Sequence, residues 1–220
     1  MNHIIVTGAS RGIGKTIAIE LANAGYKVIA TSRHAFESEH EDITTCQLDL
    51  TDENSIYSFC EFIKDLDIFC LINNAGGDPG KQNTFENWTY NYQLGVVGPM
   101  LLIKLLKEKI SQSNNPIIFN VTSLAGYDYE PQVGDAYSVS KAASIFSTKM
   151  LKKKLNSNGI RFTEICPGSV ATGPYEKQHA IDPLDIAKTI QWVISMPTKS
   201  NIDIIHISPV QKHTDFIDIK

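Results

Sequence analysis

Residues 3–14 read His3-Ile4-Ile5-Val6-Thr7-Gly8-Ala9-Ser10-Arg11-Gly12-Ile13-Gly14. The β-branched half of this stretch predicts a strand over residues 3–7, and the pattern that follows predicts a helix over residues 12–24. Between them lies a Gly-x-x-x-Gly-x-Gly turn, whose glycines can adopt unusual backbone angles and let a ligand approach closely. A helix N-terminus presents free N–H groups and a positive dipole end to a phosphate. The stretch therefore predicts a nucleotide site at the first strand–helix junction.

The rest of the chain repeats this alternation of short apolar strands with longer helical patterns. We predict one doubly wound, Rossmann-type α/β domain over residues 1–220, with a seven-stranded, mostly parallel sheet and helices on both faces. Ligands bind such domains beyond the carboxyl ends of the strands. The expected strands cover residues 3–7, 27–31, 43–48, 67–72, 116–121, 160–165 and 202–207. The expected helices cover residues 12–24, 52–64, 88–109, 134–156 and 183–195.

Composition excludes several classes of protein. The 220-residue chain has 42% hydrophobic residues, 20% charged residues and a formal net charge of −4, which argues against a nucleic-acid partner or an anionic membrane. No apolar run approaches the ~18 residues of a membrane span. The first predicted strand also starts too early for a signal peptide to precede it. Four scattered cysteines show no zinc-like spacing, so we expect no metal, and reduced thiols in the cytoplasm.

The end of the second predicted strand indicates which dinucleotide the chain binds. In many dinucleotide-binding domains an acidic residue at this point holds the ribose 2′-hydroxyl of NAD. Here the strand leads into Ser32 and Arg33 with no acid, and Arg11 lies in the glycine turn. Arginine suits a 2′-phosphate through charge-assisted hydrogen bonds, so the pattern favours NADP. The alternative is that both arginines are ordinary solvent-exposed charges.

A candidate catalytic pair lies in the helix predicted over residues 134–156. Tyr137 and Lys141 are four residues apart and share one helical face, where the ammonium can stabilise a phenolate. Tyr137 is therefore a candidate proton donor and acceptor. Ser123 follows the fifth predicted strand, at the sheet edge that Tyr137 must reach. Taken alone, the pair could also belong to an ordinary amphipathic helix, because such residues are common on helix surfaces.

Five motifs in a fixed order extend over essentially the whole chain: the glycine turn, Asn73-Asn74-Ala75-Gly76, Asn120-Val121-Thr122-Ser123, Tyr137-x-x-x-Lys141 and Pro167-Gly168-Ser169-Val170-Ala171-Thr172. With them the chain resembles the classical short-chain dehydrogenase/reductase family. The resemblance implies that Tyr137 transfers a proton, Ser123 orients the substrate oxygen and Lys141 holds the nicotinamide ribose. It implies an NADP(H)-dependent oxidoreductase that interconverts a carbonyl and an alcohol on a small molecule. The sequence patterns and the resemblance together predict the residues that bind the cofactor. They are Gly8, Ser10, Arg11, Gly12, Ile13, Gly14, Ser32, Arg33, Asp49, Leu50, Asn74, Ala75, Gly76, Tyr137, Lys141, Pro167, Gly168, Val170 and Thr172.

Two features depart from the family's usual pattern. Gly95 stands where the family usually has asparagine, seven residues after Trp88. The resemblance implies that this asparagine helps to hold a water that relays protons to the lysine. If the missing side chain has weakened this relay, Gly95→Asn should raise turnover. The segment over residues 173–182 is short for a substrate lid, which implies an open or shallow pocket.

Gly95 also keeps a second class of function open, namely a catalytically weak NADP-binding relative that acts as a sensor or interaction protein. The intact Ser123, Tyr137 and Lys141 oppose this alternative. An epimerase or dehydratase that holds NAD tightly fits the spacing of the glycine turn less well.

The two longest predicted helices carry apolar residues around more than one face. Leu101 and Leu105 are examples in the first helix, and Ile145 and Phe146 in the second. One face of each helix must cover the sheet, and a further apolar stripe usually marks an interface. Members of the resembled family commonly pair these helices across a twofold axis, so we expect a homodimer or a homotetramer. The alternative is that both stripes are buried within one subunit.

Overall fold

A seven-stranded sheet forms the centre of the computed structural model, which describes residues 3–77, 83–128, 130, 133–172, 180–197 and 199–210. The strand order is β3-β2-β1-β4-β5-β6-β7, and every neighbouring pair is parallel. This arrangement confirms the expected α/β Rossmann-type fold, with a sheet that is wholly rather than mostly parallel. The strands are β1 (His3–Thr7), β2 (Lys27–Ser32), β3 (Ile43–Gln47), β4 (Ile68–Asn73), β5 (Ile117–Val121), β6 (Arg161–Pro167) and β7 (Ile204–Ile207).

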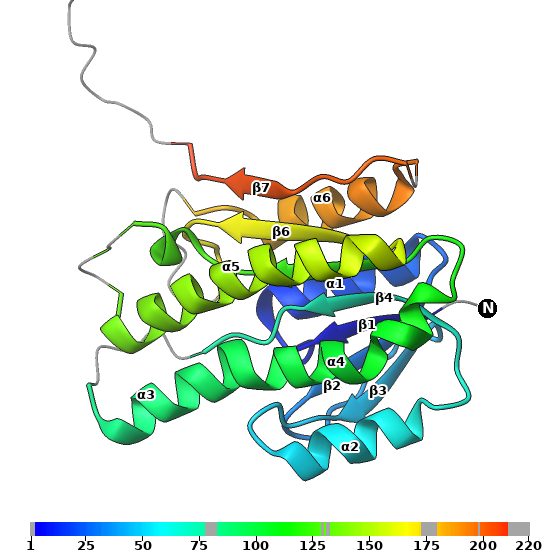
Figure 1. Ribbon diagram of the computed structural model, residues 1–220, viewed down its shortest axis with the longest axis horizontal. Coiled ribbons are helices and arrows are strands. Elements are labelled where there is room, and N and C mark those ends of the chain that lie inside the picture. Colours follow the sequence, from blue (N-terminus) through cyan, green and yellow to red (C-terminus); the bar gives the residue numbers. More distant parts are fainter. Residues whose placement is uncertain are drawn as a thin grey trace, which may run out of the picture.

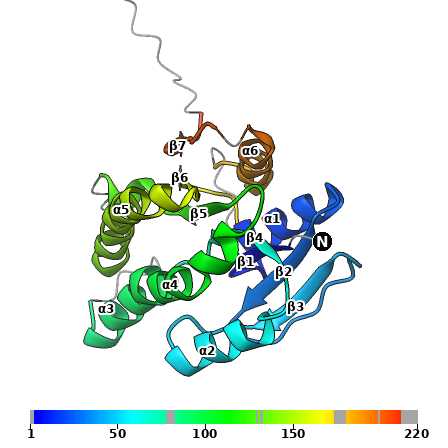
Figure 2. The ribbon, with the colours of Figure 1, turned by 45° about the vertical axis from the view of Figure 1, so that its right-hand side comes forward.

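Helices cover both faces of the sheet (Figure 1). α1 (Gly12–Asn23) and α6 (Pro183–Ser195) pack side by side on one face. α2 (Glu53–Phe62), α4 (Gly98–Ser111) and α5 (Asp135–Leu155) lie on the other face, as the turned view makes clear (Figure 2). The sheet is therefore the middle of three layers, which is the doubly wound arrangement.

Short polar side chains fix where three of the helices begin. Asp52, Thr84 and Asp182 each accept a hydrogen bond from a backbone N–H in the first turn of α2, α3 (Phe85–Tyr92) and α6. Such caps stabilise a helix because its first N–H groups have no partner within the helix. α1 differs, since Arg11 precedes it and contributes no side-chain cap.

The central strands are mostly apolar, with Asn73 and Asn120 as polar exceptions, because helices cover both of their faces. Every residue of β4 and β5 is buried. One apolar cluster joins the sheet to α1 and α6, and a second joins it to α2, α4 and α5. This packing holds the strands rigidly, so the loops at their carboxyl ends are well placed to carry a site.

The helix expected over residues 88–109 is divided in two in the structure. α3 begins earlier, at Phe85, and a π-helical turn over Gln93–Val97 connects it to α4. Gly95 lies within this turn, and Gly98 begins α4. A Cβ at Gly98 would lie 2.1 Å from the carbonyl oxygen of Leu50, so only glycine permits this approach of α4 to the loop after β3.

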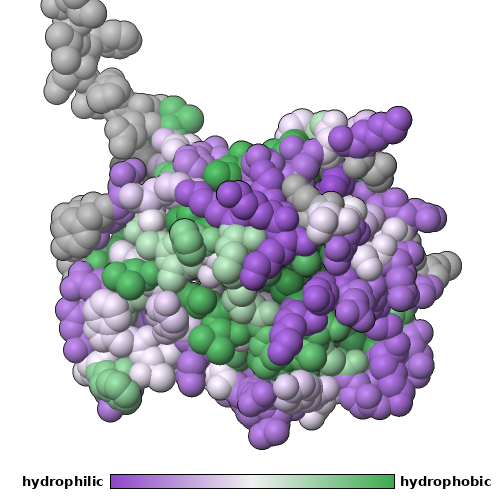
Figure 3. Space-filling model, viewed as in Figure 1, coloured by the Kyte–Doolittle hydropathy of each residue, from purple (hydrophilic) through white to green (hydrophobic). Residues whose placement is uncertain are grey.

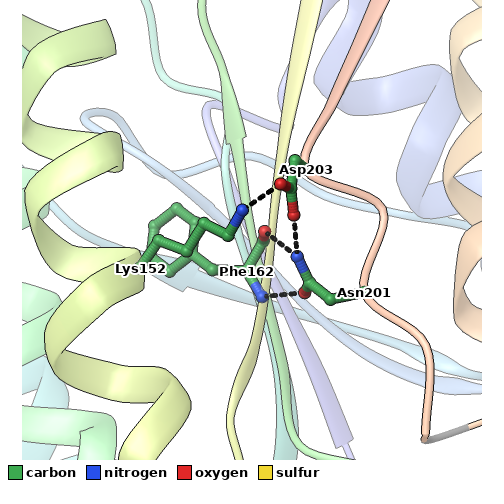
Figure 4. Close-up of polar contacts among 4 residues, drawn as sticks. All are labelled: Lys152, Phe162, Asn201 and Asp203. Carbon is green, nitrogen blue, oxygen red and sulfur yellow. Dashed lines mark hydrogen bonds and ion pairs between the residues drawn. The ribbon is translucent and has the colours of Figure 1, made fainter.

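β7 begins two residues later than expected, because the Asn201 side chain forms hydrogen bonds to β6 that strand backbone would otherwise form. The Asn201 carboxamide accepts a hydrogen bond from the Phe162 N–H at 2.8 Å and donates to the Phe162 carbonyl at 3.2 Å, as a strand would (Figure 4). It also donates to Asp203 at 2.6 Å, and Lys152 pairs with the same carboxylate. The strand itself starts at Ile204.

The four cysteines are free thiols, as the scattered spacing suggested. Cys70 and Cys166 are buried, while Cys46 and Cys60 are half-buried. Burial raises the pKa of the Cys60 and Cys166 thiols to about 11, so both remain protonated and unreactive near neutral pH. No helix in the described part of the chain is long and apolar enough to cross a bilayer.

Candidate active site

Two adjoining cavities open at the sheet edge where the strands end. The larger, of about 730 Å³, extends from the β1–α1 turn to the ends of β2 and β3. The smaller, of about 430 Å³, lies between the ends of β5 and β6 and the first turns of α5. They adjoin each other, because both are lined by Ile13, Asn74, Gly76, Tyr137 and Thr172.

Every residue that the sequence singled out as a site residue lines one or both of these cavities. In addition to the shared residues, the larger is lined by Gly8, Ser10, Arg11, Gly12, Gly14, Ser32, Arg33, Asp49, Leu50 and Ala75. The smaller is lined by Ser123, Lys141, Pro167, Gly168 and Val170. Most of the expected lid, residues 173–179, lies outside the described residues.

The glycine turn is built by close backbone approaches. Gly8 has a φ of +68°, and a Cβ there would lie 2.8 Å from the Ala75 Cα. A Cβ at Gly14 would lie 2.3 Å from the Gly8 carbonyl oxygen, and Gly12 has a φ of +57°. Any side chain at Gly8 or Gly14 would push the turn apart. The turn therefore brings the uncapped N-terminus of α1, just after Arg11, to the wall of the larger cavity.

Asn74 and Thr7 tie the ends of β4 and β1 together. The Asn74 carboxamide donates to the Thr7 carbonyl at 2.9 Å. The backbone N–H groups of Asn74 and Ala75 both donate to the buried Thr7 hydroxyl at 3.0 Å. These bonds fix the loop that borders both cavities, so its backbone forms a firm wall for a ligand.

The smaller cavity brings together Ser123, Tyr137 and Lys141. Lys141 is buried, and its ammonium donates to the Val121 carbonyl at 3.1 Å and lies 5.5 Å from the centre of the Tyr137 ring. Ser123 follows β5, and its hydroxyl accepts from the Ala125 N–H at 3.2 Å. The short 3-10 helix that follows it, Leu124–Gly126, packs tightly on α5, and Ser123 and Tyr137 line the same cavity.

A buried carboxylate supports the segment that carries Ser123. Glu164 on β6 is fully buried, and its Oε1 accepts from the Thr122 hydroxyl at 2.8 Å and from the Tyr127 hydroxyl at 3.1 Å. Glu164 therefore links β6 to the residues on both sides of the Leu124–Gly126 turn. Burial raises the pKa of the Glu164 carboxyl above its ordinary value, although both hydroxyls act in the opposite direction.

Several wall residues were not indicated by any sequence pattern. Tyr90 of α3 lines the larger cavity beside Arg33, and Glu130 and Val133 line the smaller one. An aromatic residue in a helix is usually a packing residue, and only the position of α3 brings Tyr90 to the cavity. Asp49 also lines the larger cavity, and its Oδ1 accepts from the Thr51 N–H at 2.9 Å and hydroxyl at 2.7 Å.

Comparison with known proteins gives the family. The profile of the family described as short chain dehydrogenase matches residues 2–180. An uncharacterized oxidoreductase of Staphylococcus saprophyticus is 30% identical, over 94% of this chain and 96% of the relative. The NADP-dependent 3-hydroxy acid dehydrogenase of Salmonella typhimurium is 28% identical, over 94% of each chain. A metagenomic short-chain oxidoreductase solved in complex with NADP has a TM-score of 0.81 and 26% identity, over 96% of this chain and 98% of that one.

The chain belongs to the short-chain dehydrogenase family and is an oxidoreductase. The Salmonella relative is NADP-dependent, and the metagenomic neighbour was solved with NADP bound. The larger cavity fits this cofactor, because the uncapped start of α1 offers N–H groups to a pyrophosphate and Arg11 and Arg33 offer cations to a further phosphate. Within the described residues, no cluster of three His, Cys, Asp or Glu side chains is placed to hold a metal ion.

Proposed function

We propose that the chain interconverts a carbonyl and an alcohol on a small molecule by hydride transfer, with Ser123, Tyr137 and Lys141 as its catalytic residues. One observation carries this proposal. The three side chains line a single cavity that adjoins the cavity of the glycine turn, and the Lys141 ammonium lies beside the Tyr137 ring. A substrate in the smaller cavity would thus meet a proton donor and a cofactor at one place.

The chemistry assigned to each side chain follows from the charge that develops during reduction. NADPH supplies the hydride when it is bound. Negative charge then builds on the carbonyl oxygen, where the hydroxyls of Ser123 and Tyr137 can donate hydrogen bonds. Tyr137 gives its proton to that oxygen, and the Lys141 ammonium stabilises the phenolate that remains. In the oxidative direction the Tyr137 phenolate accepts the proton from the alcohol.

The remaining site residues are proposed to hold the cofactor. The turn from Gly8 to Gly14 and the start of α1 would bind the pyrophosphate, and Ser32, Arg33 and Arg11 the 2′-phosphate. Asp49 and Leu50 would border the adenine. Asn74, Ala75 and Gly76 would line the centre of the cleft, while Pro167, Gly168, Val170 and Thr172 would border the nicotinamide.

The substrate proposed is a small carbonyl or alcohol. The Salmonella relative acts on 3-hydroxy acids, which makes a small hydroxy acid the first compound to try. Glu130 on the cavity wall would repel a carboxylate, so a neutral ketone and an aldehyde should be tried beside it. A catalytically weak sensor gains no support from the geometry, because Ser123, Tyr137 and Lys141 line one cavity.

Substitution of Tyr137 tests the proposal. Tyr137→Phe keeps the ring and removes the transferable proton, so turnover should fall by at least about 100-fold while NADPH binding changes little. NADPH oxidation with a carbonyl panel measures turnover, and fluorescence titration measures binding. Near-normal turnover in Tyr137→Phe would exclude this chemistry.

Lys141→Ala should weaken both turnover and NADPH binding, because Lys141 is assigned to both.

We also propose that the chain assembles as a homodimer, or as a tetramer of such dimers. Apolar surface gathers over α4 and α5 on the face seen in Figure 3. Between these helices lies a groove of about 360 Å³ whose lining includes Met100, Leu101, Met150 and Leu151, together with Lys104, Lys107 and Lys154.

The free thiols agree with a reducing compartment, and we propose the cytoplasm.

A further inference from the structure

The guanidinium of Arg33 is held by two neighbours at the wall of the larger cavity. Its Nη1 donates to the Tyr90 hydroxyl at 3.3 Å, and its central carbon lies 5.9 Å from the centre of the Tyr90 ring. Its Nε also donates to His34 at 3.2 Å. Arg33, His34 and Tyr90 all line this cavity, with Ser32 next to them. The cation therefore has both a hydrogen-bond acceptor and an aromatic face to fix it.

The two partners differ in how firmly the fold holds them. Arg33 follows the end of β2 and is exposed, so its long side chain would sample many rotamers if it were free. Tyr90 is half-buried on α3, and its ring packs against the apolar cluster formed with α2, α4 and α5. The tyrosine is thus the rigid partner and the arginine the mobile one. Contact with a rigid ring restricts the guanidinium before any ligand arrives.

We propose that Tyr90 is a positioning residue for the choice of cofactor, because it holds the Arg33 guanidinium where the 2′-phosphate of NADP(H) binds. The two contacts seen within the described residues engage one N–H on Nη1 and the N–H on Nε. The guanidinium has five N–H groups, so an edge remains to face a phosphate. Tyr90 acts through Arg33 and selects NADP(H) over NAD(H), which lacks that phosphate.

A double-mutant cycle in cofactor binding tests this role. Calorimetric titration with NADP⁺ and with NAD⁺ would be made on the native chain, Tyr90→Phe, Arg33→Ala and the double variant. Tyr90→Phe keeps the ring and removes the acceptor, so NADP⁺ should bind about three- to fivefold more weakly and NAD⁺ less than about twofold more weakly. In the Arg33→Ala background the same substitution should have no further effect, because its target has gone.

Two further variants sharpen the cycle. Tyr90→Leu also removes the aromatic face, so NADP⁺ should bind about tenfold more weakly. Tyr92→Phe is the matched control, because Tyr92 lies on the same helix, is 45% exposed and does not line the cavity. Its affinities for both cofactors should equal those of the native chain.

The outcomes separate this role from others. If Tyr90→Phe weakens NADP⁺ equally with and without Arg33, Tyr90 contacts the cofactor directly and the proposal is wrong. If NADP⁺ and NAD⁺ lose the same factor, Tyr90 serves the adenine common to both, which also overturns it. If Tyr90→Leu binds NADP⁺ more tightly than the native chain does, the ring hinders cofactor binding, which also overturns the proposal. The native chain's own turnover of carbonyl compounds tests the proposed reaction separately, so failure of one leaves the other standing.

Discussion

Glu164 is a single side chain that supports the segment carrying Ser123. It is fully buried on β6 and receives hydrogen bonds from Thr122 and Tyr127, on either side of Ser123. Its second carboxylate oxygen, Oε2, is buried and makes no hydrogen bond within the described residues. Lys149 and His206 are the charged or titratable neighbours that favour its ionised form, but desolvation outweighs them. The carboxyl pKa is therefore raised above its ordinary value of 4.5.

A raised carboxyl pKa predicts a definite trend of stability with pH. The folded chain holds this proton more tightly than the unfolded chain, so the contribution to stability is complete below pH about 4.5 and is lost as the pH rises through the folded-state pKa. Glu164→Gln removes the titration. The free energy of unfolding of the native chain, minus that of the variant, should therefore fall by up to about 1.4 kcal/mol per pH unit across this window.

Urea unfolding at several pH values between 4.5 and 8 would measure this difference. Glu108→Gln is the control, because Glu108 is exposed on α4, and its difference from the native chain should stay constant. A constant difference for Glu164→Gln as well would mean that the carboxyl titrates alike in both states.

At the scale of elements, the π-helical turn between α3 and α4 brings Gly95 close to α5. A Cβ at this position would lie 3.4 Å from the Ser140 Oγ and 3.7 Å from the Ser140 Cβ, so one methyl group just fits between the two helices. Ser140 lies between Tyr137 and Lys141, and its hydroxyl donates to the Tyr137 carbonyl at 2.8 Å. A larger side chain at position 95 would therefore extend beside Ser140, in the turn of α5 that carries Tyr137.

From this contact we expect the opposite direction for Gly95→Asn from the one predicted from the sequence. An asparagine carboxamide packed beside Ser140 should shift Ser140, and with it Tyr137, so kcat should fall by about tenfold. Gly95→Ala, whose methyl group makes an ordinary contact, should keep kcat within about twofold of the native value. Steady-state NADPH oxidation measures both. A rise in turnover with Gly95→Asn would show instead that the missing side chain limits the native enzyme.

At the scale of the whole molecule, the face formed by α3, α4 and α5 exposes several large apolar side chains, which can mark an interface. Leu102 and Leu106 of α4 are buried against the sheet, as one stripe must be. Phe146 of α5 remains 71% exposed, and Val97 and Val139 remain 52% and 47% exposed. The apolar stripes are thus not fully consumed within one subunit.

Sedimentation at micromolar concentration should give a species of at least twice the 24.4 kDa chain mass. Phe146→Glu places a charge in the proposed interface and should shift the protein toward the 24.4 kDa species, because an unpaired charge is costly to bury. Trp192→Glu is the control, since Trp192 is 55% exposed on α6, on the opposite face of the sheet. A native chain that sediments only as a 24.4 kDa species would contradict the proposed assembly.

The sequence by itself was sufficient to predict the fold, the glycine turn and the Tyr137–Lys141 pair. Each depends on neighbours a few residues apart: alternation of strand and helix patterns, glycine where φ is positive, and the i, i+4 spacing of one helical face. The ranges of β1 and α6 match the structure residue for residue. Boundaries that depended on other parts of the chain, such as the start of β7 beside Asn201, were less accurate.

Only the tertiary structure determined the contacts between distant segments. Arg33 and Tyr90 are 57 residues apart, and Thr122 and Glu164 are 42 apart. Such pairs meet because the strand order and the packing of helices on the sheet bring them to one edge, and no local pattern encodes that distance. The approach of Gly95, in the π-helical turn, to Ser140 of α5 is of the same kind, because the two residues are far apart in sequence. Local chemistry thus determined which residues are candidates for the site, and long-range packing determined which of them touch.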